Sequence, residues 1–440
     1  MSTALWIPTI LVMILGSRSV SSWAGGINFH PGLGNETTGS PLDEIFYGAI
    51  MISSLFVTIV RGVKWGKFLK SNIPLMALYA FFAVSILWSG DPLGSTKRLV
   101  KDFGLLLTIA VILTEKDPHQ AIRVVYLRCA CILIPLSIVF DRYFPIIGRQ
   151  YTVNGTPMST GVTVQKNTLG EIVLVFCTIL LWDYLEKLGR TRAFSLRRVP
   201  WDQLVLFAMG LYLLSESRSK TALLSLIICV ALSVRKGWLA SKLASVVAFL
   251  AALASPFLLF STQEFGDVIR PIVEALGRNM TFTGRTNIWA QINIDTVNPF
   301  IGSGYWNFWG GPGGLSIAAA MNTPIPNAHC GYLDIYLDGG VCGLAVLFCF
   351  LLAYGLRRIK HSQEGLFQMV QFSFLVMVMV YNLAESSFAR IGLLWFTTLL
   401  LIVDFPKVAR SRRNRQESAE GIDTNINQID PEVARWSVVR

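Results

Sequence analysis

The chain has 440 residues, of which 53% are hydrophobic and only 15% are charged, and its formal net charge is +11. About a quarter of the residues in soluble domains are charged, so this composition excludes a soluble globular protein. Long apolar runs recur along the chain and do not alternate as barrel strands would. They predict an all-α integral membrane protein, a polytopic bundle of about 12 transmembrane helices.

The apolar runs divide the chain into four parts. Helices 1 to 9 fall in residues 1–260 and helices 10 to 12 in residues 332–403, on either side of one large loop, residues 261–331. Residues 404–440 form a basic tail that we expect to be disordered. The first run has no basic segment before it, which favours an uncleaved helix over a signal peptide. The helices are expected to start near Ala4, Ile45, Ile73, Leu99, Ala121, Thr168, Leu204, Thr221, Leu243, Leu333, Phe367 and Gly392.

The basic residues predict the orientation of the bundle. Most of them fall in loops that share one side with the N-terminus, so the positive-inside rule predicts that both termini are cytoplasmic and that the large loop lies outside. The net charge is explained by this topology and by anionic lipid headgroups, and we expect no nucleic-acid partner. The basic segments are Arg61–Lys70, Lys187–Arg198, Arg235–Lys242, Arg357–Lys360 and the tail from Lys407.

The motifs that are missing narrow the chemistry. The seven cysteines are scattered without metal-binding spacing, so we expect no disulfide framework, no metal site and no cofactor. The sequence has no Walker A motif, no HExxH, no GxSxG and no DxD pair. ATP hydrolysis, zinc proteolysis and the use of sugar nucleotides are therefore disfavoured.

The large loop is predicted to contain short helices that lie against the bundle. Apolar residues between Val268 and Leu276 fall on one helical face, and Ile288, Trp289 and Ile292 fall on another. Turns follow, including the step from Gly302 to Gly304. A loop of this length is usually functional.

Cations on the outer face oppose the topological bias and so suggest a function. Arg218 in Ser-Glu-Ser-Arg-Ser-Lys220, Arg285 in Thr-Gly-Arg-Thr-Asn, and Lys166 in Gln-Lys-Asn-Thr-Leu-Gly should all lie near this face. Converging guanidinium groups suit a lipid-linked phosphate or pyrophosphate, because they bind its oxygens bidentately. The alternative is that each side chain only reaches toward the headgroups or pairs with a neighbour such as Glu216.

Two further ionisable residues and an aromatic cluster are candidates. His329, at the end of the loop, could accept a hydroxyl proton or could merely cap the next helix. Glu385, at the outer end of a late helix, could orient an arginine or the histidine, or form a simple salt bridge with Arg390. Tyr305 and Trp306 could stack on sugar faces, although an interfacial aromatic belt is the more common reason for such a cluster.

The order of these motifs resembles the O-antigen ligase and Wzy-type polymerase superfamily of bacterial envelope glycan assembly. The resemblance covers most of the chain, and its early blocks are most similar to the exopolysaccharide-polymerase branch. One departure is that Ala328 separates Asn327 from His329. The motifs are Leu-Trp-Ser-Gly-Asp-Pro92 with Thr96 and Arg98, Lys166-Asn-x-Leu-Gly170, Ser215-x-Ser-Arg218, Gly284-Arg285 with Trp289, Asn298-Pro-x-x-Gly-x-Gly304, and Asn327-Ala-His329 through Gly343.

The resemblance implies a metal-independent glycosyltransferase of the bacterial inner membrane with a periplasmic active site. Such enzymes transfer a glycan from an undecaprenyl-pyrophosphate carrier to the hydroxyl of an acceptor glycan. Arg218 and Arg285 would hold the pyrophosphate, and His329 would be the base or would orient the acceptor. A co-polymerase that sets chain length is a candidate partner. The candidate substrate-binding residues are Lys166, Lys220, Arg98, Tyr305, Trp306 and Glu385.

The sequence leaves the exact reaction open. Polymerisation of repeat units is favoured by the early motifs, and ligation to a lipid A core or another acceptor is the first alternative. A non-enzymatic polysaccharide transporter or flippase would also have many helices, but it would place its charges near the bilayer midplane rather than at one face. A scaffold subunit of a synthesis complex is the third alternative.

Overall fold

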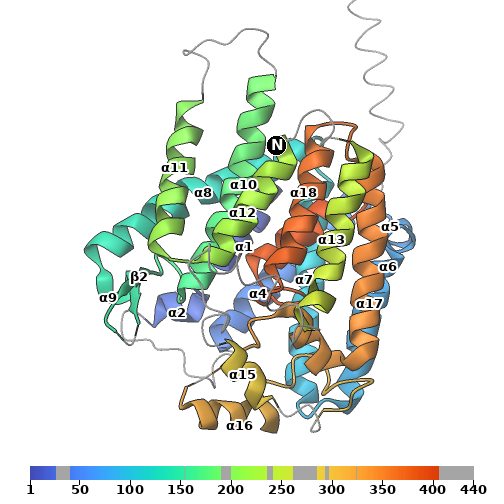
Figure 1. The fold of residues 1–440 in the computed structure, drawn as a ribbon. Coiled ribbons are helices and arrows are strands. Elements are labelled where there is room, and N and C mark those ends of the chain that lie inside the picture. Colours follow the sequence, from blue (N-terminus) through green and yellow to red (C-terminus); the bar gives the residue numbers. More distant parts are fainter. Residues whose placement is uncertain are drawn as a thin grey trace, which may run out of the picture.

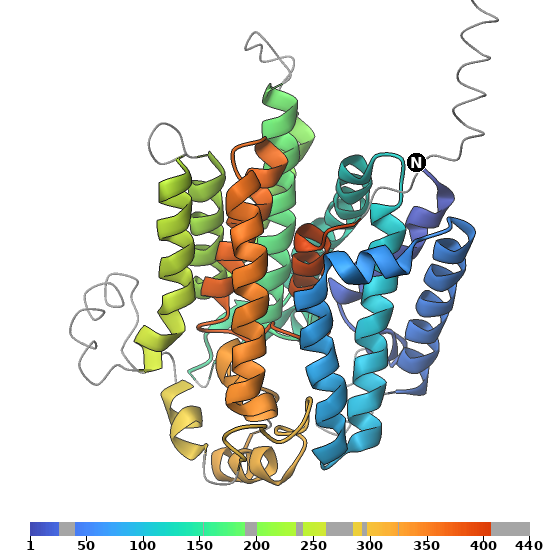
Figure 2. The same ribbon diagram turned by 90° about the vertical axis from the view of Figure 1, so that its right-hand side faces the viewer.

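The computed structural model describes residues 1–25, 40–152, 154–189, 200–234, 241–260, 285–292, 297–323 and 325–405. Long helices run roughly parallel and form a bundle (Figures 1 and 2). The helices are α1 (Trp6–Leu15), α2 (Val20–Ala24), α4 (Pro41–Val60), α5 (Trp65–Ser71), α6 (Ile73–Ser85), α7 (Pro92–Leu113), α8 (Pro118–Tyr143), α9 (Pro145–Gly148), α10 (Lys166–Gly189), α11 (Trp201–Glu216), α12 (Lys220–Val234), α13 (Lys242–Phe260), α15 (Arg285–Gln291), α16 (Pro312–Met321), α17 (Gly331–His361), α18 (Leu366–Tyr381) and α19 (Leu393–Ile402).

The helices confirm an all-α integral membrane protein. Among the described residues, α4, α8, α10 and α17 are long and apolar enough to cross a bilayer, and α5 with α6 would make a fifth span bent by 94°. Each predicted helix start lies within about four residues of the start of a described helix, except Leu99, which lies two turns inside α7. Several of these helices are shorter, so twelve spans remains a prediction. A small antiparallel hairpin of β1 (Arg149–Tyr151) and β2 (Pro157–Ser159) was not predicted.

The most apolar helices lie inside the bundle or face the bilayer, depending on their neighbours. Every residue of α19 is buried, and so is almost all of α18 from Val370 onward. A helix that is apolar all round must be surrounded by protein or lipid. By contrast, α4 exposes apolar side chains such as Ile52 and Phe56, at 67% and 66%. Its outer face is therefore suited to contact with lipid tails.

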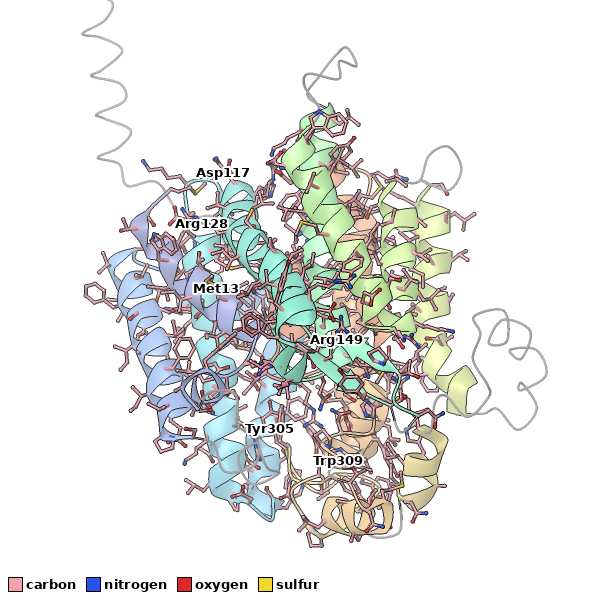
Figure 3. All side chains as sticks on the ribbon, turned by 90° about the vertical axis from the view of Figure 1, so that its left-hand side faces the viewer. Met13, Asp117, Arg128, Arg149, Tyr305 and Trp309 are labelled. Carbon is pink, nitrogen blue, oxygen red and sulfur yellow. The ribbon has the colours of Figure 1, made fainter. Side chains whose placement is uncertain are left out.

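The two ends of the bundle differ. The N-terminal segment is held at one end, where the Ser2 N–H donates to Glu115 (3.2 Å) and Arg61 pairs with the same carboxylate (2.5 Å). Helices α15 and α16 lie at the opposite end (Figure 1). Tyr305 and Trp309 lie toward that second end, whereas Asp117 and Arg128 lie toward the first (Figure 3). We call the end with α15 and α16 the site end.

The described part of the large loop has its own apolar core. The predicted face of Ile288, Trp289 and Ile292 lies on α15 and in the segment directly after it. The predicted helix at 268–276, like the tail from residue 406, falls outside the described residues. Leu337 of α17 joins this core and ties it to the bundle. The core consists of Ile288, Ile292, Val297, Phe308, Trp309, Ile317, Ile325, Ala328 and Leu337.

Helix α17 is interrupted at Gly340, and the loop fills the break. Gly340 has a φ of 61°. The freed carbonyls of Leu337 and Asp338 accept from the N–H groups of Ser303 and Gly304, at 2.9 Å each. Below the break, the Val341 and Cys342 N–H groups donate to the carbonyls of residues 299 and 300, at 2.8 and 3.0 Å. Broken helices persist at membrane depth only where such groups are satisfied within the protein.

The turn at Gly302 requires glycine for two separate reasons. Its φ is +66°, and a Cβ there would lie 2.4 Å from the backbone of Asp338. We expect Gly302→Ala to cost about 1–2 kcal/mol for the left-handed backbone and a further 1–3 kcal/mol for the clash. Thermal unfolding of the purified protein in detergent measures the loss.

The matched control for this variant is Gly155→Ala. Gly155 also has a positive φ, +72°, but a Cβ there would meet nothing within 4 Å. Gly155→Ala should therefore lower the free energy of unfolding only by the cost of the left-handed backbone. Equal destabilisation by the two substitutions would contradict the close packing of Gly302 on α17.

Candidate active site

A buried carboxylate joins a predicted arginine and the predicted histidine. Arg285, the first residue of α15, forms an ion pair with Glu385 Oε1, and His329 Nδ1 lies 3.2 Å from Glu385 Oε2. Arg285 and Glu385 are each 6% exposed. The sequence predicted that Glu385 orients an arginine or the histidine, and it contacts both. Its alternative partner, Arg390, pairs elsewhere.

The backbone around His329 is fixed by four hydrogen bonds. The His329 N–H donates to Asn327 Oδ1 (2.9 Å), and the Ala328 N–H donates to Asp334 Oδ1 (3.0 Å). The Trp289 indole donates to the Ala328 carbonyl (2.9 Å), and the N–H of residue 331 reaches the Glu385 carbonyl (3.0 Å). His329 itself has a φ of 50°, a strained conformation for a residue other than glycine. The surroundings thus hold the imidazole in one place.

Arg218 also has a left-handed backbone, with a φ of 52°. It lies in the turn between α11 and α12, where its side chain is exposed. Within the described ranges it has no ion pair and no recorded bond to the Arg285–Glu385–His329 cluster. Next to it, Ser219 packs on Gly170 of α10, where an added Cβ would lie 2.7 Å from the serine. This contact places the Arg218 turn beside the first turns of α10.

The two lysines of the predicted set flank that contact. Lys166 is the first residue of α10, and its N–H donates to Gln150 Oε1 (3.2 Å). Lys220 is the first residue of α12 and is exposed. Lys166, Arg218 and Lys220 therefore border one region of the site end.

Tyr305 lies in the core and not on a surface that a sugar could reach. It is 1% exposed, and its hydroxyl donates to the buried Asp102. Burial raises the pKa of Tyr305 well above its ordinary value, so the hydroxyl keeps its proton and remains a donor. The sequence could not show this role, because Asp102 lies far away along the chain. The position of Tyr305 disfavours the predicted stacking on sugars.

Trp306 lies between two arginines. Its ring centroid is 4.2 Å from the guanidinium carbon of Arg390 and 5.5 Å from that of Arg98. The Arg98 Nη1 donates to the Trp306 carbonyl (3.1 Å), and the indole donates to the Ala389 carbonyl (2.9 Å). These contacts are of the cation–π type, which prefers arginine on tryptophan.

Arg390 is a residue of this site that the sequence reasoning considered only as a partner of Glu385. Its Nη2 lies 3.4 Å from Asp338 and 3.6 Å from Asp334, both buried on α17. Asp334 also accepts from the Trp309 indole (2.7 Å). Two carboxylates one helical turn apart at the start of an apolar helix were the signal that could have predicted a buried cation here.

A polar cleft opens beside these residues. Its volume is about 330 Å³, and a second cavity of about 280 Å³ shares Ser17, Thr168, Ser386, Arg390 and Ile391 with it. Volumes of this size approach or fall within the range of about 300–1,000 Å³ that is typical of ligand sites. The polar cleft is lined by Ser17, Arg98, Val164, Gln165, Thr168, Trp306, Trp309, Gly310, Ile325, Pro326, Asn327, Ser386, Arg390 and Ile391.

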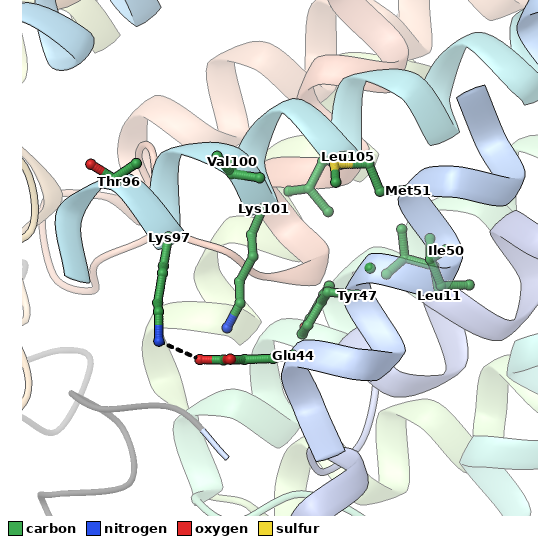
Figure 4. Close-up of a pocket in the computed structure, with 12 residues that line it drawn as sticks. Leu11, Glu44, Tyr47, Ile50, Met51, Thr96, Lys97, Val100, Lys101 and Leu105 are labelled. Atoms are coloured by element: carbon green, nitrogen blue, oxygen red, sulfur yellow. Dashed lines mark hydrogen bonds and ion pairs between the residues drawn. The ribbon is translucent and has the colours of Figure 1, made fainter. Parts of the chain in front are cut away.

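An apolar groove of about 260 Å³ lies between α4 and α7 (Figure 4). Lys97 crosses it to Glu44, with 2.8 Å between Nζ and Oε1. Lys101 lies 5.2 Å from the ring centroid of Tyr47. Arg98, the neighbour of Lys97, lines the polar cleft instead. The first turns of α7 therefore present one face to the groove and another to the cleft.

Comparison with known proteins shows that part of the chain is similar to a known family. Residues 203–348 match the O-antigen ligase family model. This segment contains Arg218, Arg285, Trp306 and His329. The match confirms the resemblance to the O-antigen ligase and Wzy-type polymerase superfamily that the sequence predicted.

A curated relative supports the same class. The chain is 24% identical over 306 residues to the exopolysaccharide production protein ExoQ of Rhizobium meliloti (strain 1021). The alignment covers 66% of each protein, just under two thirds of the relative's length.

Removing the carboxylate of Glu385 should strongly destabilise the site end, even though the intact buried pair adds little net stability. Glu385→Ala would leave the buried Arg285 guanidinium without its carboxylate. Breaking a buried pair typically costs about 3–5 kcal/mol, and we expect that loss of unfolding free energy in detergent.

Glu364→Ala is the control, because it removes a glutamate whose Oε1 lies 2.6 Å from His361 Nδ1 in an exposed pair. An exposed pair contributes about 0–1 kcal/mol. Similar, small effects of both variants would show that the Arg285–Glu385 contact does not form.

Proposed function

We propose that this chain is a membrane glycosyltransferase of bacterial surface polysaccharide assembly. It would transfer a growing glycan from an undecaprenyl-pyrophosphate carrier to the hydroxyl of an acceptor glycan on the periplasmic side. The observation that carries the proposal is the cluster in which Glu385 joins Arg285 and His329 at one end of a membrane bundle. The match to the O-antigen ligase family supports it.

His329 has the arrangement that a general base requires. Its Nδ1 faces Glu385, so a proton on Nδ1 leaves the lone pair of Nε2 for the acceptor hydroxyl. The carboxylate would then stabilise the imidazolium formed when that proton is taken, as an acidic partner does in other His-based sites. The acceptor oxygen forms a bond to the anomeric carbon while the bond to the carrier's phosphate oxygen breaks.

Arg285 and Arg218 would have different roles in binding the pyrophosphate leaving group. The charge of Arg285 is balanced by Glu385, so its spare N–H groups can bind phosphate oxygens but add little net charge. Arg218 is exposed and, in the described part of the chain, has no acidic partner. It would supply the positive charge that stabilises the departing pyrophosphate, with Lys166 and Lys220 beside it. In this proposal the free energy for transfer comes from cleavage of the glycosyl–pyrophosphate bond, and neither a nucleotide nor a metal takes part.

Polymerisation and ligation differ in the acceptor that receives the glycan. We favour polymerisation of repeat units, since the relative is named for exopolysaccharide production. Ligation is the second candidate, because the matching family model is described as O-antigen ligase. In either case we place the protein in the inner membrane with both termini cytoplasmic, and for the polymerase we propose a co-polymerase as the partner that sets chain length. A transporter is disfavoured by the gathering of candidate residues at one end.

Variants suited to a left-handed backbone can test the chemistry without adding strain. Glycine and asparagine adopt the left-handed backbone more easily than other residues. Arg218→Gly and His329→Asn should therefore keep the backbone conformation at these positions while they remove the guanidinium and the base. We expect each to lower the transfer rate by about 10²- to 10³-fold, as losing one electrostatic or general-base group does. Arg285→Ala should show a similar loss.

The measurement is gel analysis of surface glycan from a deletion strain that carries each variant at equal membrane levels. Single repeat units on the carrier without long glycan would indicate a polymerase, and long glycan that stays on the carrier would indicate a ligase. Arg142→Ala is the control, because this exposed arginine at the end of α8 contacts Tyr212 and Asp141 and none of the proposed site residues. Normal long glycan from Arg218→Gly and His329→Asn would rule out the proposed roles.

A further inference from the structure

We propose that the polar cleft binds the sugars of the acceptor glycan and that these sugars are uncharged where they contact it. The inference rests on the proposed function, because it assumes that His329 receives the proton of an acceptor hydroxyl. It adds the site that holds the acceptor and the chemical class that this site selects.

The lining of the cleft fits sugar hydroxyls. Gln165 and Asn327 contribute amides, and Thr168 and Ser386 contribute hydroxyls. Trp309 also lines the cleft, but its indole N–H is already bonded to Asp334. Amides and hydroxyls both donate and accept hydrogen bonds, as sugar hydroxyls do. Ser386 Oγ is buried and has no hydrogen-bond partner in the described structure. A buried hydroxyl in this state is satisfied when a ligand supplies the partner.

Buried aspartates behind the cleft offset part of the positive charge of its two arginines, which disfavours a phosphate. Arg390 faces Asp338 and Asp334, at 3.4 and 3.6 Å. Arg98 lies in the field of Asp91 and Asp338 as well as of Arg390. The aspartates do not line the cleft themselves, but their negative charge behind Arg390 offsets part of the positive charge that a phosphate would meet. A neutral sugar can instead accept hydrogen bonds from the arginines at no electrostatic cost.

The position of the cleft assigns it to the acceptor and not to the donor. Asn327, whose side chain holds the His329 N–H, lines the cleft, and so does Ser386, which follows Glu385. Arg285 and Arg218, the proposed pyrophosphate ligands, do not line it. A glycan in the cleft would thus be held beside the histidine by residues other than the two proposed pyrophosphate arginines.

The test uses the purified full-length protein in lipid nanodiscs with its lipid-linked donor and neutral oligosaccharides cut from the host's own surface polysaccharide. The transfer rate is followed as a function of oligosaccharide concentration. We expect Gln165→Ala and Ser386→Ala each to raise the KM for the oligosaccharide about tenfold, as the loss of one well-placed hydrogen bond would, with kcat within a factor of about two. Fluorescence titration without donor should show the same weakening, since Trp306 and Trp309 line the cleft.

Lys97→Gln is the matched control, since Lys97 precedes Arg98 but crosses the apolar groove to Glu44 (Figure 4). It should leave the KM unchanged, whereas Arg98→Gln should raise it. Unchanged KM and binding in the Gln165 and Ser386 variants would overturn the proposal. If the wild-type protein binds the oligosaccharide in a Ser386-dependent manner but transfers nothing, the cleft stands and the proposed reaction fails.

Discussion

The break in α17 is the constraint on which the site end depends. A helix that stops at Gly340 leaves carbonyl and N–H groups that would cost several kcal/mol each if they stayed unpaired inside a membrane. The backbone of residues 299–304 pairs with them on both sides of the break. The loop is therefore attached by main-chain hydrogen bonds, which fix its position whatever its side chains are. Tyr305 and Trp306 follow directly, so the break determines where the aromatic residues and their arginines lie.

Buried carboxylates then organise the cations around this attachment. Glu385 holds Arg285 and faces His329, while Asp334 and Asp338 hold Arg390. Each carboxylate would be too costly to bury alone, and each is accompanied by a cation from a distant part of the chain. Such pairs contribute little net stability, but they set the positions of charged groups before any substrate binds. This preorganisation is what electrostatic catalysis requires.

The sequence predicted the membrane bundle well because hydropathy depends only on local composition. All twelve expected helix starts coincide with described helices, and the face of Ile288, Trp289 and Ile292 lies where its spacing predicted. It also singled out Arg285, His329 and Glu385, which the structure brings together. It missed the break at Gly340, because the partners of the freed groups lie some forty residues earlier along the chain. It could not show that Tyr305 is buried against Asp102 or that Arg390 pairs with Asp334 and Asp338, because these acidic residues are distant in sequence.

The distribution of charge explains how one end of a bundle could serve two different substrates. Arg218 is exposed, and within the described residues no acid neutralises it, whereas the arginines of the polar cleft face buried aspartates. We propose the first region for the pyrophosphate and the second for a neutral glycan. The Glu385 cluster lies at the boundary, since Ser386 and Asn327 belong to the cleft while Arg285 does not. A base held there can reach an acceptor hydroxyl without being exposed to the full charge of the leaving group. Left-handed backbone at Arg218, Trp306 and His329 is the conformational cost of this arrangement, and it lies at the residues where the two substrates would meet.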